Sequence, residues 1–248
     1  MARMTAMRGC LLATAVIAGS LAALLPGKAA LAGSFQVNPV NINLPADKAT
    51  AALTIRNEDD APLSVRISAF AWTQENGADV YTPTKDVLAT PPIVTIPAKG
   101  SQTVRVGLRK RDTSAERTYR VIVEEIPQQI EGKTAVQMVL RLNLPLYALP
   151  KTEGKSELSW SAWRDTDGNM VVEGRNSGSL HEQVLELNAK TASGKSINLS
   201  KTMGVVLPGS ARQWKIGKPE GLTPGASFQL VTKTAHGENQ ESLTLEKR

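Results

Sequence analysis

Large apolar side chains occupy every second position along one stretch of this sequence, from Val136 to Leu146. A period of two places them on one face of a single extended strand, about twice as long as the usual strand of five or six residues. Two interpretations follow: a strand buried in the core of its own sheet, or a row of side chains presented to another protein. The row consists of Val136, Met138, Leu140, Leu142, Leu144 and Leu146.

The first 32 residues have the pattern of a secretory signal peptide. Arg3 and Arg8 form a positive start, and an apolar stretch follows over residues 10–25. Ala30-Leu31-Ala32 then provides a small-residue cleavage site. We expect cleavage before Gly33 and export of the rest; the alternative is an uncleaved anchor.

Composition narrows the classes of function. The one cysteine, Cys10, lies in the signal peptide, so the exported chain would have no disulfide and no thiol chemistry. Loss of Arg3, Arg8 and Lys28 with the same segment lowers the net charge from +6 to +3. No dense basic stripe with interleaved aromatics occurs, which argues against nucleic acid as a partner. No later stretch is apolar enough for membrane insertion.

Strand patterns dominate the first half of the exported chain, and no helical periodicity interrupts them. Asn76-Gly77 is a strong hairpin turn, and Thr90-Pro91-Pro92 is a rigid corner in which one X–Pro bond is a candidate for the cis form. About seven strands at this spacing are typical of an immunoglobulin-like sandwich. The expected strands cover residues 35–44, 49–56, 63–72, 93–96, 101–109, 119–126 and 136–146.

A second series of strands follows a short polar segment, residues 150–155, which we interpret as an interdomain hinge. We therefore expect an all-β protein with a signal peptide (1–32), an N-terminal immunoglobulin-like domain (33–149) and a smaller β-sandwich domain (150–248). The second series covers residues 158–163, 170–173, 181–189, 197–199, 205–207, 212–216, 228–234 and 242–245.

The sequence offers little material for catalysis. His181 and His236 are its only histidines, and they are far apart, without patterned acidic or cysteine neighbours. A metal site or a Ser-His-Asp triad is therefore not expected, and each histidine is interpreted as an exposed strand-end or loop residue. No phosphate-binding glycine loop occurs. We expect no catalytic residue, no metal and no cofactor, so that the protein acts by binding and not as an enzyme.

One segment, residues 116–127, resembles the signature strand of the periplasmic pilus chaperones of the chaperone–usher pathway, the PapD-like chaperones. In it Glu116 and an aromatic residue, Tyr119, precede an apolar run that ends in Glu125-Ile126-Pro127. The resemblance extends from about Phe35 to the C-terminus. Its other landmarks are Ala89-Thr90-Pro91-Pro92, Ile96-Pro97, Gln102-x-x-Arg105, Asn176-x-Gly178 and Val206-Leu207-Pro208-Gly209-Ser210.

The resemblance implies a fold and a function. The family has two immunoglobulin-like domains and lends its last N-terminal strand, without ATP, to a pilus subunit whose own sandwich lacks one. It then delivers the subunit to an outer-membrane usher. Here the lent strand would be residues 136–146, and residues 128–134 would form a mobile loop before it. Because a bare apolar edge invites aggregation, we also expect the free protein to self-associate.

The physical chemistry of the row suits this role. A subunit that lacks a strand exposes a hydrophobic groove and two unpaired sheet edges. If several of the six side chains enter that groove, the gross gain is on the order of 10 kcal/mol before ordering costs. Pro145 cannot donate a ladder hydrogen bond, so it suits an edge strand better than a central one.

The chain also departs from the family. Better-known members hold the subunit's C-terminal carboxylate with an arginine and a lysine, but the corresponding positions are Asn41 and Pro145 here. Likewise Leu149 stands where the arginine partner of Glu116 would be. We expect a divergent branch, the archaic one, in which another cation binds the carboxylate. The candidates, in order of preference, are Arg120, Lys133 and Arg141.

Two other classes of function remain open. A surface component, such as an adhesin or a pilin-like protein, would usually carry a disulfide or a free N-terminal extension, and neither is evident here. An enzyme acting on carbohydrate would need two carboxylates brought together by the fold, which the sequence does not suggest.

Overall fold

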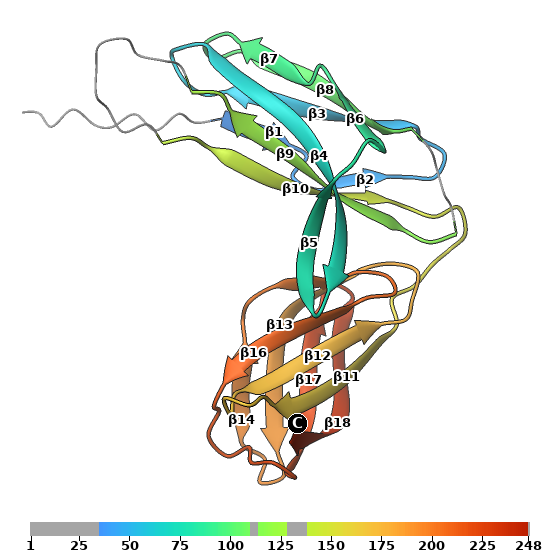
Figure 1. Ribbon diagram of the computed structural model, residues 1–248, viewed down its shortest axis with the longest axis vertical. Coiled ribbons are helices and arrows are strands. Elements are labelled where there is room, and N and C mark those ends of the chain that lie inside the picture. Colours follow the sequence, from blue (N-terminus) through green and yellow to red (C-terminus); the bar gives the residue numbers. More distant parts are fainter. Residues whose placement is uncertain (1–34, 110–113, 128–137, 248) are drawn as a thin grey trace, which may run out of the picture. The chain divides into compact units, whose positions relative to one another are not determined.

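The computed structural model describes residues 35–109, 114–127 and 138–247. Within these residues every regular element is a β-strand, and the strands form two sandwiches, β1–β10 and β11–β18 (Figure 1). The same residues contain no helix with the length and hydropathy needed to cross a bilayer.

The first sandwich consists of a four-stranded sheet in the order β1-β3-β8-β6 and a six-stranded sheet in the order β2-β10-β9-β4-β5, in which β7 also pairs with β4. β10 lies between β9, which is antiparallel to it, and β2, which is parallel to it. The strands are β1 (Phe35–Asn38), β2 (Ile42–Leu44), β3 (Thr50–Asn57), β4 (Leu63–Glu75), β5 (Ala78–Pro83), β6 (Val87–Thr90), β7 (Ile93–Ile96), β8 (Ser101–Leu108), β9 (Arg117–Glu125) and β10 (Arg141–Ala148).

The core of this sandwich follows from alternation along its strands. On β9, Tyr119, Val121 and Val123 face inward and are at most 1% exposed. On β3 of the other sheet, Leu53 and Ile55 meet them from the opposite side. Period-two patterning thus gives each sheet one apolar face, and the two faces pack together.

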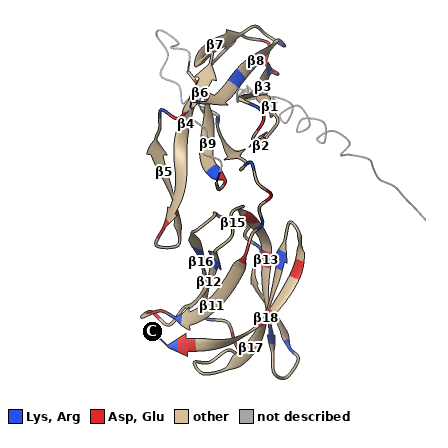
Figure 2. Cartoon of the chain, turned by 90° about the vertical axis from the view of Figure 1, so that its right-hand side faces the viewer, with Lys and Arg blue, Asp and Glu red and all other residues tan. Residues whose placement is uncertain are grey.

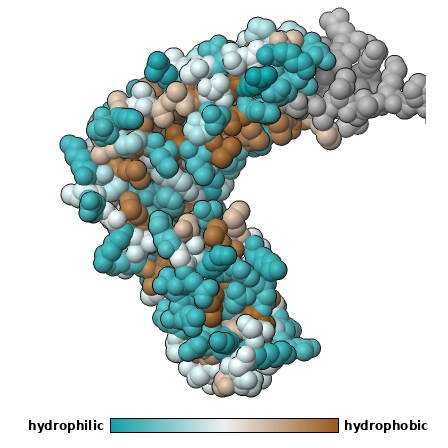
Figure 3. Space-filling view, turned by 180° about the vertical axis from the view of Figure 1, so that it is seen from behind, coloured by the Kyte–Doolittle hydropathy of each residue, from teal (hydrophilic) through white to brown (hydrophobic). Residues whose placement is uncertain are grey.

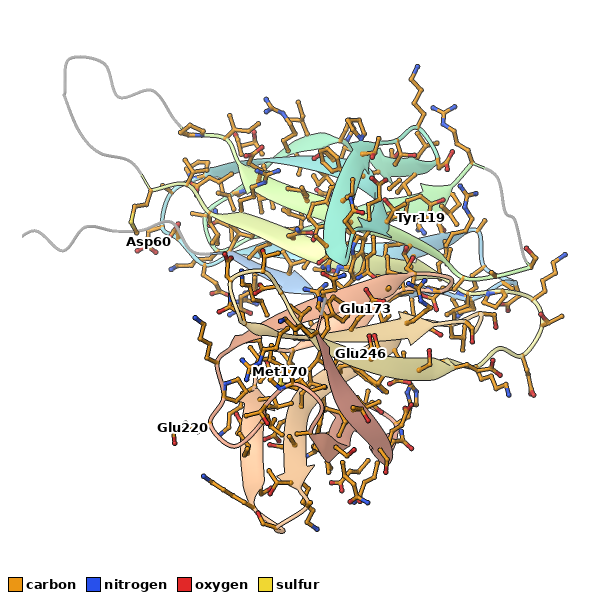
Figure 4. The ribbon with its side chains drawn as sticks, turned by 60° about the horizontal axis from the view of Figure 1, so that its bottom comes forward. Asp60, Tyr119, Met170, Glu173, Glu220 and Glu246 are labelled. Carbon is orange, nitrogen blue, oxygen red and sulfur yellow. The ribbon has the colours of Figure 1, made fainter. Side chains whose placement is uncertain are left out.

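The second sandwich has its own core. Its strands are hydrogen-bonded in the order β14-β13-β17-β18-β11-β12-β16 as one eight-stranded sheet, in which β15 also pairs with β13. A short parallel contact between β11 and β18 joins the two halves of this sheet. Met170 and Leu230 are completely buried between them, and Figure 4 labels Met170 here and Tyr119 in the first sandwich. The strands are β11 (Leu158–Arg164), β12 (Met170–Asn176), β13 (Glu182–Thr191), β14 (Ser196–Ser200), β15 (Gly204–Val206), β16 (Ala211–Gly217), β17 (Ser227–Thr234) and β18 (Gly237–Lys247).

The expected all-β fold of two immunoglobulin-like sandwiches is confirmed, with differences in detail. The Asn76-Gly77 turn joins β4 to β5, a strand that the sequence analysis did not predict. The peptide bond before Pro91 is cis, as is the one before Pro39. The long strand predicted over residues 136–146 appears as β10, which begins at Arg141 and continues to Ala148. Residues 128–137, including the expected loop, lie outside the described residues.

Candidate functional site

β10 has one edge that is only partly covered. β9 pairs with it along its whole length, from Arg141 to Ala148. On the other side β2 pairs with Leu146, Tyr147 and Ala148 alone. In the part of the chain that the structure describes, no strand pairs with this edge between Arg141 and Pro145.

The backbone groups at this edge can be assigned from the ladder. The N–H of Glu125 donates to the carbonyl of Leu140 over 3.0 Å. In an antiparallel pair the direction of these groups alternates, so those of Arg141 and Asn143 point away from β9 toward the open edge. Pro145 has the same orientation but no N–H, so the run of open donors ends where β2 begins to pair.

The burial of the apolar row changes along the strand. Leu146 and Leu144 are 0% and 6% exposed in the core of their own domain. Leu142 and Leu140 are partly buried against that core, and Met138 is 71% exposed. Figure 3 shows apolar side chains, in brown, at the surface of the first sandwich among polar ones in teal.

Burial thus divides the row of six side chains that the sequence predicts for a donor strand. Leu144 and Leu146 are core residues because the second sheet of their own sandwich covers them. The accessible part of the row is Met138 together with Leu140 and Leu142. Val136 lies outside the described residues.

Arg120, the preferred anchor candidate, is a cation with no acidic partner among the residues that the structure describes. It lies on β9 opposite Pro145. Its Cζ is 3.6 Å from the ring centroid of Trp72 and 5.8 Å from that of Tyr81, distances at which cation–π attraction operates. Its buried Nε atom has no hydrogen-bond partner, and no ion pair to it occurs within the described residues. A partly buried guanidinium in this state is suited to bind a carboxylate.

The other two candidates are less suited. Arg141 is exposed on the open part of β10, with its Nε 4.0 Å from Glu124, which partly neutralises it. Lys133 lies outside the described residues. Figure 2 shows Lys and Arg scattered among Asp and Glu over both sandwiches, without a continuous basic stripe.

The Trp72 indole, on which Arg120 stacks, is held in place by Asp79 of β5. Trp72 Nε1 donates to Asp79 Oδ1 over 3.0 Å, and Gln74 Nε2 donates to the same oxygen over 2.9 Å. Nη1 of Arg212, from β16 of the second sandwich, donates to both oxygens over 2.9 and 2.8 Å. Burial alone would raise the pKa of Asp79, but these hydrogen bonds, that of Arg212 foremost, hold it below its ordinary value of 3.8.

A second cross-sandwich contact involves Glu116, whose side chain is 0% exposed. Its carboxylate lies 2.7 Å from Nδ1 of His181 and accepts the His181 backbone N–H over 3.1 Å. The imidazole stacks on Tyr147 with ring centroids 3.7 Å apart. Burial raises the pKa of Tyr147 to about 12. His181 lies at the strand end before β13, as expected, but its side chain is only 25% exposed, because Glu116 and Tyr147 cover it.

Sequence reasoning missed most of this cluster. The backbone N–H of Leu207 donates to the side-chain amide oxygen of Gln74, although the two residues are 133 positions apart. The same number of positions separates Asp79 from Arg212. No local pattern marks such pairs, because each residue alone looks like a solvated surface group. One weak signal was available: Trp72 ends a predicted strand on the parity opposite to the core residues Val65 and Ile67.

Comparisons with known proteins give a family match and a match in fold. Residues 34–153 match the family model of the PapD N-terminal domain, described as a pili and flagellar-assembly chaperone. No curated protein sequence gives a significant match to the chain.

Solved structures share the fold at low identity. A chain of the CsuC–CsuE chaperone–tip adhesion subunit pre-assembly complex, from archaic Csu pili of Acinetobacter baumannii, is 22% identical with a TM-score of 0.65, covering 87% of this chain and 99% of that one. A chain in the Salmonella enterica SafA pilin–SafB chaperone complex is 18% identical with a TM-score of 0.58, covering 86% and 96%. The Escherichia coli chaperone DraB is 18% identical with a TM-score of 0.56, covering 87% and 97%.

Proposed function

We propose that this chain, which is a PapD-like pilus-assembly chaperone, completes an unfinished sandwich in a pilus subunit by lending it the open part of β10. The observation that supports this is the coincidence of two features. Among the described residues no strand pairs with the edge of β10 over residues 141–145, and the apolar row becomes accessible from Leu142 back to Met138. Backbone donors and apolar side chains are then available together, as strand addition requires.

The free energy for this comes from burial. Three side chains, Met138, Leu140 and Leu142, entering a subunit groove would gain roughly 5–9 kcal/mol before ordering costs. That gain is large enough to shift a marginally stable subunit toward its folded form. The reaction therefore needs no ATP, and the chaperone acts as a binding protein and not as an enzyme.

We place the subunit's C-terminal carboxylate at Arg120. Arg120 is the partner of Pro145 in the strand ladder, where the open edge ends, and its guanidinium has no acidic partner among the described residues. A charge-assisted hydrogen bond there would fix the register of the subunit strand against β10. Arg120 would thus replace the two cations that are absent at Asn41 and Pro145, in keeping with a divergent, archaic branch of the family.

The setting of this reaction is the periplasm. The signal peptide, residues 1–32, would be removed on export, residues 33–149 would bind the subunit, and residues 150–248 would form the second domain. The loaded chaperone would then deliver its subunit to an outer-membrane usher.

The donor strand is tested by charge substitution. Met138→Glu and Leu140→Glu should each abolish recovery of a pilus subunit with the tagged chaperone from periplasmic extracts, because a carboxylate cannot enter an apolar groove without a large desolvation cost. Met203→Glu is the matched control, since Met203 is 62% exposed in the second sandwich and should leave recovery unchanged. A separate experiment tests ATP independence: the purified chaperone should refold the captured subunit when no nucleotide is added.

Thermal unfolding of each variant separates loss of binding from loss of folding. A Met138→Glu chaperone that melts like wild type and still recovers its subunit would contradict the proposal.

The anchor is tested with a synthetic peptide that covers the last strand of the recovered subunit, made as the free acid and as the amide. Wild type should bind the acid more tightly, and Arg120→Gln should lose this preference while its affinity for the amide stays the same. Isothermal titration measures both constants. Equal affinity of wild type for acid and amide would exclude Arg120 as the anchor.

A further inference from the structure

We infer that Arg212 of the second sandwich keeps the Arg120 guanidinium available for a ligand by occupying Asp79, the carboxylate at the edge of the Trp72 indole. The inference rests on the proposed role of Arg120 and adds a positioning residue to it. It also means that carboxylate binding at Arg120 depends on residues of both sandwiches.

The three groups share one aromatic ring. Arg120 stacks on the face of Trp72 at 3.6 Å, whereas Asp79 accepts the indole N–H at its edge over 3.0 Å. The cation and the carboxylate therefore contact the same indole, one at its face and the other at its edge. An arginine side chain is long and flexible enough to reach from one place to the other. Yet no contact between Arg120 and Asp79 forms, and the Arg120 Nε atom stays without a partner.

Arg212 accounts for this arrangement. Its Nη1 contacts both oxygens of Asp79 at 2.8 and 2.9 Å, and its side chain is 23% exposed. The other donors to this carboxylate, Gln74 and Trp72, carry no charge. Within the described residues, Arg212 is thus the cation that neutralises Asp79.

Without Arg212, Asp79 would be an ionised carboxylate held within reach of Arg120 by the fold itself. Such an internal group acts at a high effective concentration and would compete with the carboxylate of an incoming chain. The two arginines therefore have different roles: Arg212 satisfies the internal acid, and Arg120 is left for the external one.

A pair of substitutions tests this. Arg212→Gln should lower the preference for the peptide acid over the peptide amide by roughly fivefold, since Asp79 then captures Arg120. Adding Asp79→Asn to Arg212→Gln should restore the preference, because the competing charge is gone. If Arg212 acted only by holding the two sandwiches together, the double variant would not recover the preference for the acid, because it still lacks the ion pair between Asp79 and Arg212. Arg175→Gln, at an exposed arginine paired with Glu173, is the control and should match wild type.

Each outcome has one meaning. Affinity for the amide measures the folded fraction, because the amide does not use the anchor. If wild type prefers the acid but Arg212→Gln retains that preference, the inference is overturned and the anchor stands. If the double variant is no better than Arg212→Gln, the competition mechanism is overturned. If wild type shows no preference, the proposed role of Arg120 itself fails.

Discussion

At the scale of single residues, Asp79 shows how a surface-type side chain becomes structural. It is bound by Trp72 and Gln74 from its own sheet and by Arg212 from the other sandwich. Burial disfavours its charge, but the three hydrogen-bond donors outweigh that cost and its pKa is lowered below 3.8. The ionised form of Asp79 therefore stabilises the fold.

This stabilisation should depend on pH in a defined direction. Since the folded pKa lies below the unfolded one, the contribution is fully present above 3.8 and is lost as the pH falls through the folded value. The melting temperature of wild type should exceed that of Asp79→Asn at neutral pH, and the difference should shrink as the pH falls below that value. Thermal unfolding followed by circular dichroism measures it. Asp60→Asn, at a side chain 94% exposed, should follow wild type at every pH, and an Asp79→Asn difference that does not change with pH would refute the assignment.

At the scale of elements, the two ends of β10 differ in how far the rest of the domain covers them. Leu144 and Leu146 close the core, and β2 covers the edge beside Leu146. Toward Arg141 neither the edge nor the apolar face is fully covered. An edge strand of this kind is prone to pair with another chain.

We therefore propose that the free chaperone self-associates through this edge until a subunit replaces the second copy. Sedimentation velocity of the exported chain should show a dimer that increases with concentration, and Met138→Glu should reduce it, because the charge would be buried at the pairing edge. Met203→Glu should dimerise as wild type does. A wild-type protein that stays monomeric up to its solubility limit would refute self-association.

At the scale of the whole molecule, two separate cores are joined by a small contact. Trp72 and Tyr147 from the first sandwich meet Leu207 from the second, and these three side chains are at most 6% exposed. Polar contacts surround them, including Glu116 with His181. The anchor candidate stacks on Trp72, so its environment depends on residues from both sandwiches.

Much of the fold could be predicted from the sequence because strand signals are local. The alternation of Val65 and Ile67 assigned β4 its inner face, and Asn76-Gly77 predicted the turn into β5. Pairing across the sandwiches could not be predicted in this way. Glu116 is 65 positions from His181, and nothing near either residue indicates that they meet.

By itself the sequence determined that this chain forms β-sandwiches and that the apolar side chains of β10, Leu142, Leu144 and Leu146, lie on one side of that strand, since a period of two assigns every side chain to a face. It did not determine how far along the strand that face is covered, or which arginine lacks an acid. Only the tertiary structure decided these: Met138 is exposed, Leu146 is buried, and Arg120 has no acidic partner in the part of the chain that the structure describes. The physical reason is that burial and ion pairing depend on what lies opposite a side chain, and here the opposing groups come from distant parts of the chain.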